Sequence, residues 1–164
     1  MTKLEPRDRF IKALNREPLE GLVPHFELVF FLTMEVLGKV HPTHRNYSQW
    51  FQMAEKERQL HREDMADLFI DIAEKYDHSA IFLHPNPWSF EETIRLIDII
   101  REKTGNKYFL MIHGDATFSV PSGTQMEAFA YRIADEPEKL KQEANQMVEN
   151  ALRLLSVPVS LLRC

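Results

Sequence analysis

The sequence predicts an α/β fold in which short parallel strands alternate with helices, and three observations point to this class. Three short runs rich in apolar and β-branched residues have the length and composition of strands, at residues 22–30, 79–83 and 107–113. Helical periodicity fills the intervals between them. Each interval is also long enough for the right-handed crossover that joins parallel strands.

The N-terminal part is expected to form a helix over residues 5–15, because a proline lies in its first turn and apolar residues recur on one face. The strand at 22–30 follows. Pro24 has no N–H to donate to a ladder, so this strand begins there or lies at a sheet edge. His25 and Glu27 are two residues apart and therefore share one face of the strand.

The long interval before the second strand is expected to hold two helices, at residues 48–60 and 63–76. The segment 41–46 before them has the composition of a loop. His41 and His44 have a spacing that metal ligands use, but no third ligand accompanies them, so we interpret them as surface histidines.

Three capping boxes, in each of which a Ser, Thr or Asp is followed three residues later by Glu, mark the starts of the remaining helices. They begin at Ser89, Thr124 and Asp135, and the last helix carries an apolar stripe at steps of four and three. Residues 156–164 have a strand-like composition, but Pro158 is unfavourable inside a sheet. Three or four strands fit either a small open sheet or part of an eight-stranded barrel, which typically takes about 250 residues.

Composition indicates an ordinary globular protein with a single domain over residues 1–164, since 44% of its residues are hydrophobic and 27% are charged. A net charge of −5 argues against a nucleic-acid partner, and the apolar run at 28–32 is far too short to span a membrane. The mixed charges of residues 55–64 are typical of a solvated helix face. Cys164 is the single cysteine, which excludes an intrachain disulfide and favours a cytoplasmic location.

Polar, ionisable side chains follow each predicted strand at its C-terminal end. They are His25 and Glu27, His84, and the pair His113 and Asp115. Because ligands of α/β proteins gather at the carboxyl edge of the strands, we expect these side chains to converge on one site. Each also has a structural interpretation, since a histidine can plug a strand end and a carboxylate can cap a loop or helix.

Two aromatic residues near the same strand ends, Trp88 and Phe118, could form stacking walls for a planar ring system. The alternative is that they belong to the core, which is the commoner place for aromatic residues at the base of a loop.

The segment 108–123, with the later stretch 135–140, resembles the uroporphyrinogen decarboxylase superfamily, which includes cobalamin-dependent methyltransferases. The opening at residues 6–18, followed by Val23 and Pro24, is similar to the short helix and first strand with which such proteins begin. The likeness runs over most of the chain and would cover about the first half of a family member.

The resemblance implies a partial TIM-type (β/α)8 barrel, of which this chain supplies the first three to four strand–helix units. It also implies a tetrapyrrole or corrinoid substrate at the C-terminal mouth. His113, Asp115, His84 and Glu27 would line that mouth as catalytic residues. His25, Phe118 and Trp88 would bind the substrate.

Two departures from the decarboxylase pattern favour the methyltransferase branch. Decarboxylases carry an arginine-rich stretch after the first strand, which holds substrate carboxylates, but residues 25–31 contain no arginine. Decarboxylases also place an aspartate at the end of the second strand, where this chain has His84. Corrinoid-dependent methyl transfer is therefore the leading expectation, with cobalamin and zinc as possible cofactors and a corrinoid protein as a possible partner.

Three alternatives remain at this point. The chain could decarboxylate uroporphyrinogen in porphyrin biosynthesis. It could be a metal-dependent hydrolase in which His84, His113 and Asp115 hold a divalent ion, or a catalytically inactive fragment. Because a partial barrel leaves open sheet edges, we also expect the chain to form a homo-oligomer.

Overall fold

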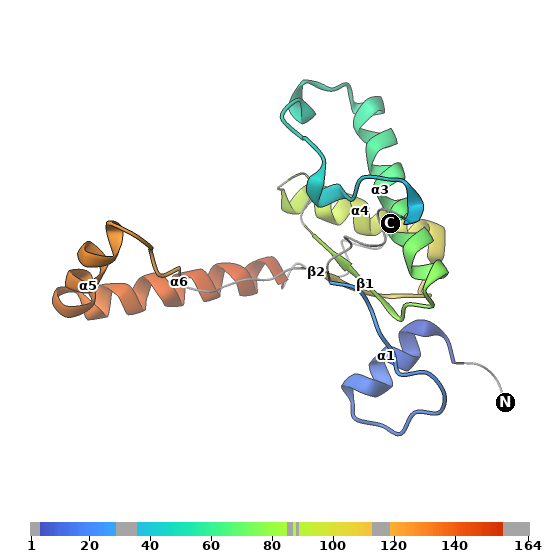
Figure 1. Ribbon diagram of the computed structural model, residues 1–164, viewed down its shortest axis with the longest axis horizontal. Coiled ribbons are helices and arrows are strands. Elements are labelled where there is room, and N and C mark those ends of the chain that lie inside the picture. Colours follow the sequence, from blue (N-terminus) through green and yellow to red (C-terminus); the bar gives the residue numbers. More distant parts are fainter. Residues whose placement is uncertain (1–3, 29–35, 85–86, 88, 113–118, 156–164) are drawn as a thin grey trace. The chain divides into compact units, whose positions relative to one another are not determined.

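The computed structural model describes residues 4–28, 36–84, 87, 89–112 and 119–155. The chain divides into two compact units, Met1–His113 and Gly114–Cys164, where the sequence suggested one domain (Figure 1).

Over its described residues, the first unit contains helices α1, α3 and α4, the 3-10 turns η1 and η2, and the strands β1 and β2. Their bounds are α1 Pro6–Leu14, η1 Pro42–His44, η2 Trp50–Gln52, α3 Glu55–Lys75, β1 Ala80–Leu83, α4 Phe90–Thr104 and β2 Phe109–Ile112. The two helices predicted at 48–60 and 63–76 are in fact η2 and one continuous α3. No glycine or proline interrupts residues 55–75, so nothing ends the helix within that stretch.

Strands β1 and β2 form a parallel two-stranded sheet, which confirms the α/β class. Ala80 pairs with Phe109 and Leu83 with Ile112. Helix α4 makes the crossover between them, and Ser89 caps it as predicted by accepting a hydrogen bond from the backbone N–H of Glu92.

The predicted first strand is an extended segment rather than a strand of the ladder over its described residues, 22–28. Two hydrogen bonds hold it along β1. The backbone N–H of Ser79 donates to the His25 carbonyl at 2.8 Å, and His84 Nε2 lies 2.9 Å from the Leu28 carbonyl. The later residue of the extended segment, Leu28, contacts the later residue of the second segment, His84. The extended segment therefore runs parallel to β1.

The hydrophobic core lies between one face of the sheet and helices α3 and α4, while α1 covers the other face (Figure 1). Ile81 and Leu83 project into this core. On the opposite face the Phe10 ring of α1 packs 5.1 Å from Phe109 and 5.9 Å from Phe26. This alternation follows from the two-residue period of a strand.

A buried arginine ties α1 to the turn that precedes β1. Arg9 is 6% exposed, and its Nε donates to Ser79 Oγ at 3.0 Å. Its Nη2 donates to the Asp77 carbonyl at 3.1 Å. Asp77 has a left-handed φ of 50°, which is uncommon for a residue other than glycine, so Arg9 stabilises a turn of unfavourable conformation.

The second unit is a helical hairpin of α5, Gln125–Asp135, and α6, Pro137–Leu155. Arg132 Nη2 contacts both carboxylate oxygens of Glu143, at 2.8 and 2.9 Å, and so links the two helices. The capping box predicted at Asp135 does not form, because Asp135 ends α5 and Pro137 opens α6. Over the described part of the chain, every helix is too short or too polar to cross a lipid bilayer.

Candidate functional site

His84 follows the last residue of β1 and is partly buried at the C-terminal end of that strand. Its Nε2 lies 2.9 Å from the Leu28 carbonyl. A carbonyl oxygen only accepts hydrogen bonds, so Nε2 carries the proton in this contact. The Phe82 ring lies 5.1 Å away at 70°.

Two further imidazoles gather near His84, and we name His41, His44 and His84 the histidine cluster. The His41 ring lies 6.1 Å from that of His84 and 6.5 Å from that of His44, measured between ring centroids. His44 is exposed, as predicted, but the surface interpretation of His41 is wrong because it is 2% exposed. Pro42 opens the η1 turn and places His41 at its N-cap, with the imidazole 5.4 Å from Phe69 of α3.

Local hydrogen bonds hold His41 neutral. Its Nδ1 accepts from the Thr43 backbone N–H at 3.2 Å and lies 2.7 Å from Thr43 Oγ1. Burial, together with smaller contributions from His84, His44 and Arg45 in that order, lowers the pKa of His41 to about 4. At neutral pH His41 therefore adds no charge to the cluster.

His25 lies at the other end of β1, in contrast to its expected place beside His84. Its Nε2 is 2.9 Å from the Tyr76 carbonyl, just before the strand, and its ring is 5.2 Å from that of His78. Glu27 is partly buried within the extended segment. The structure therefore does not bring His25 to the same rim as His84.

The other four predicted site residues fall outside the described part of the chain: His113, Asp115, Phe118 and Trp88. Among the residues that are described, no group of three His, Cys, Asp or Glu side chains could hold a metal ion. The histidine cluster is thus a hydrogen-bonding site in this structure, built from η1, the extended segment and the end of β1.

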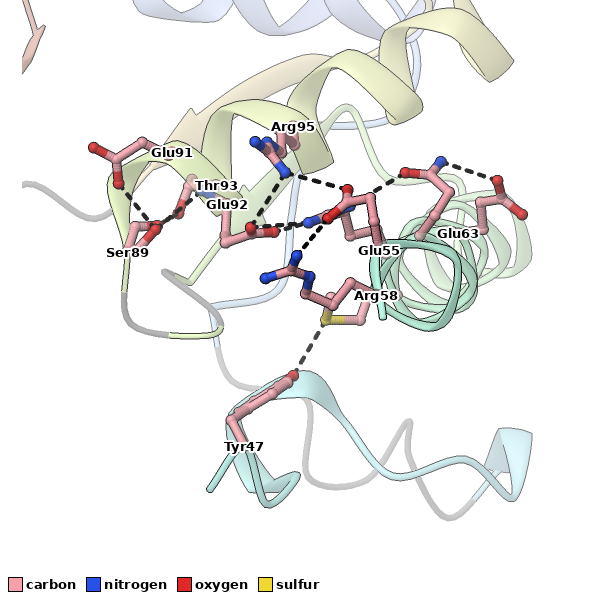
Figure 2. Close-up of polar contacts among 12 residues, drawn as sticks. Tyr47, Glu55, Arg58, Glu63, Ser89, Glu91, Glu92, Thr93 and Arg95 are labelled. Carbon is pink, nitrogen blue, oxygen red and sulfur yellow. Dashed lines mark hydrogen bonds and ion pairs between the residues drawn. The ribbon is translucent and has the colours of Figure 1, made fainter. Parts of the chain in front are cut away.

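A second polar cluster, between α3 and α4, is structural. Arg62 is 1% exposed and pairs with Glu92 through two hydrogen bonds of 2.6 and 2.9 Å. Figure 2 shows Arg95 bridging Glu55 of α3 and Glu92 of α4. The expectation of a solvated face over residues 55–64 is therefore wrong at Arg62, whose guanidinium also packs 5.6 Å from the Trp50 ring centroid.

A cavity of about 400 Å³ lies along α3, and none of its lining residues is a predicted site residue. It is lined by Met53, Glu57, Leu60, His61 and Asp64. The Asp64 carboxylate is already engaged by Arg45, at 2.6 Å, and by Lys39, at 3.5 Å.

No protein-family model, curated protein or solved structure matches this chain.

Sequence reasoning missed His41, although one signal could have found it. A histidine directly before proline, with a threonine two residues on, fits an N-cap whose side chain receives backbone N–H groups. A capping side chain in that place turns back toward the protein rather than out into solvent.

Proposed function

We propose that this chain is the N-terminal part of a barrel of the uroporphyrinogen decarboxylase superfamily, and that it acts on a corrinoid-linked substrate in methyl transfer. The observation that carries this proposal is the order of its parallel segments. The extended segment, β1 and β2 lie side by side in chain order, held by the Ser79–His25 contact and by the β1–β2 ladder. A (β/α)8 barrel is built in this order, and α3 and α4 pack together on one face of the strands, as the outer helices of a barrel do.

The place of His84 supports a site at the barrel mouth. It lies at the carboxyl end of β1, where barrel enzymes collect their substrate contacts. With Nε2 protonated toward the Leu28 carbonyl, neutral His84 has a lone pair on Nδ1. That atom can accept a hydrogen bond from an amide or ring N–H of a bound macrocycle.

The charge around the histidine cluster favours a corrinoid over uroporphyrinogen. Uroporphyrinogen is rich in carboxylates, which need several unengaged guanidinium or ammonium groups. Here Arg45, near His41, is paired with Asp64 at 2.6 Å, and His41 is neutral. Corrinoid side chains are mostly neutral amides, which imidazoles can meet with hydrogen bonds.

The methylated corrinoid would be a substrate of the reaction. For zinc, the described residues offer no set of three ligands. We therefore derive no step that passes through zinc. A homo-oligomer is part of the proposal, since β2 pairs with β1 and with no other strand in the described part of the chain.

Absorbance titration of the chain with cobalamin and with a porphyrinogen analogue tests this proposal. We expect a saturable change in the cobalamin spectrum and a much weaker response to the analogue. A tighter interaction with the analogue would support decarboxylation instead. Absence of binding to either ligand would overturn both.

A further inference from the structure

We propose that His41 is a positioning residue, whose ring helps to hold the His84 ring in the orientation in which Nε2 meets the Leu28 carbonyl and Nδ1 is the atom presented to a ligand N–H donor. The identity of the ligand rests on the proposed function, but the inferred tautomer of His84 is independent of it. It follows from contacts between η1, the extended segment and the end of β1.

His41 is itself held in one tautomer. The Thr43 backbone N–H points at Nδ1 from 3.2 Å, so Nδ1 must carry a lone pair and the proton of the neutral ring lies on Nε2. The ring is 2% exposed and stands edge-on to Phe69 at 88°. A side chain with this burial and two hydrogen bonds to Thr43 has little freedom to rotate.

His84 lies between two rings. The His41 ring meets it at 84° with centroids 6.1 Å apart, and the Phe82 ring meets it at 70° with centroids 5.1 Å apart. Its Nε2 reaches the Leu28 carbonyl at 2.9 Å. Turning the His84 ring over would replace Nε2 by a carbon atom at that carbonyl and lose the hydrogen bond, so one orientation is favoured.

A protonated His41 would place a cation beside His84 and disfavour a proton or a ligand N–H dipole there. Because Thr43 and burial keep His41 neutral, no cation at position 41 opposes a ligand N–H at Nδ1 of His84.

The first measurement needs no substitution. Imidazole ¹⁵N spectra of the full chain at neutral pH should show, for His41 and for His84, a protonated Nε2 and an unprotonated Nδ1. A protonated Nδ1 on neutral His84, or an even mixture of its tautomers, would overturn the inference.

The second measurement compares His41→Asn with the matched control His44→Asn. Asparagine can still cap η1 through its side-chain oxygen, so the turn is retained while the ring is lost. We expect the His84 ¹⁵N signals to move toward the average of the two tautomers in His41→Asn and to stay in place in His44→Asn. Unchanged His84 signals in a folded His41→Asn would contradict the positioning role.

Cobalamin titration of the same variants separates the two proposals. If the site binds as proposed, His41→Asn should weaken cobalamin binding about fivefold to tenfold, the range expected for one compromised hydrogen bond, and His44→Asn should not. Failure of the wild-type chain to bind cobalamin overturns the proposed function, while the ¹⁵N spectra still decide the role of His41. Equal binding by wild type and His41→Asn counts against His41 as a positioning residue.

Discussion

At the scale of single residues, protonation of His41 makes the stability of the fold depend on pH. The unfolded chain takes up a proton at this position near pH 6.5, whereas the folded chain does so only near pH 4. Between these values the unfolded state binds more protons, so the stability is fully present above pH 6.5 and is lost as the pH falls toward 4. His78 contributes in the same direction, because burial lowers its pKa as well.

We predict that the free energy of unfolding falls between pH 6.5 and pH 4 by an amount on the order of 3 kcal/mol through His41, since the pKa drops from 6.5 to about 4. Denaturant unfolding of wild type and His41→Asn across this range measures the effect. The variant should lose less stability on acidification. Parallel pH dependences of the two proteins would contradict the assignment.

The buried Arg62–Glu92 pair gives a second prediction at the residue scale. Arg62→Met leaves the largely buried Glu92 carboxylate with only its longer contact to the exposed Arg95, at 3.6 Å, so we expect a loss of about 3 kcal/mol. Lys103→Met is the matched control, because Lys103 and Asp67 also join α4 to α3 but at the surface, where a loss of about 1 kcal/mol or less is expected. Equal losses in the two variants, measured by denaturant unfolding, would show that the buried pair has no special weight.

At the scale of elements, the sequence located most helices and both ladder strands, because local signals decide them. The capping box at Ser89 and the apolar run before His84 are complete within a few residues. The break predicted inside α3 was wrong, since charged residues there are good helix formers and Arg62 finds its buried partner, Glu92, on α4. Such partners cannot be seen from the helix alone.

The extended segment beside β1 gives a prediction at the same scale. Its Phe26 ring lies 5.9 Å from Phe10 and 6.3 Å from Phe82, and these contacts hold the His25 carbonyl at the Ser79 N–H. We expect Phe26→Ala to speed amide exchange at Ser79 about tenfold, as loss of roughly 1.4 kcal/mol of local stability would. Exposed Leu22→Ala is the control and should leave the rate unchanged. Rapid exchange at Ser79 in the wild type would show that the segment is not held there.

At the scale of the whole molecule, the α/β class was predictable because the spacing of apolar residues distinguishes strands from helices within a few residues. The site was less so. We expected His25 and His84 to lie at the same edge of the sheet, because both follow predicted strands. In the structure, His25 instead bonds to the Tyr76 carbonyl, near the start of β1. Pro24 removes one ladder donor from the first segment, which is placed by the Ser79–His25 backbone hydrogen bond and by side-chain contacts.

One edge of β2 is not paired with any described strand, which leads to a prediction about association. Among the described strands, β2 pairs only with β1, and each of its four residues is partly exposed. We expect the chain to form dimers or larger oligomers in sedimentation experiments at high protein concentration, because unpaired edges recruit further strands. A single monomeric species across a wide concentration range would contradict this expectation.

The proposal as a whole depends on a ligand site at the carboxyl end of β1. Cobalamin titration of His84→Ala and His25→Ala tests it most directly, since the two histidines lie at opposite ends of the same strand and each contacts a backbone carbonyl. The account predicts that His84→Ala weakens binding about tenfold while His25→Ala binds like the wild type. Weaker binding only in His25→Ala, or equal binding by both variants, would contradict it.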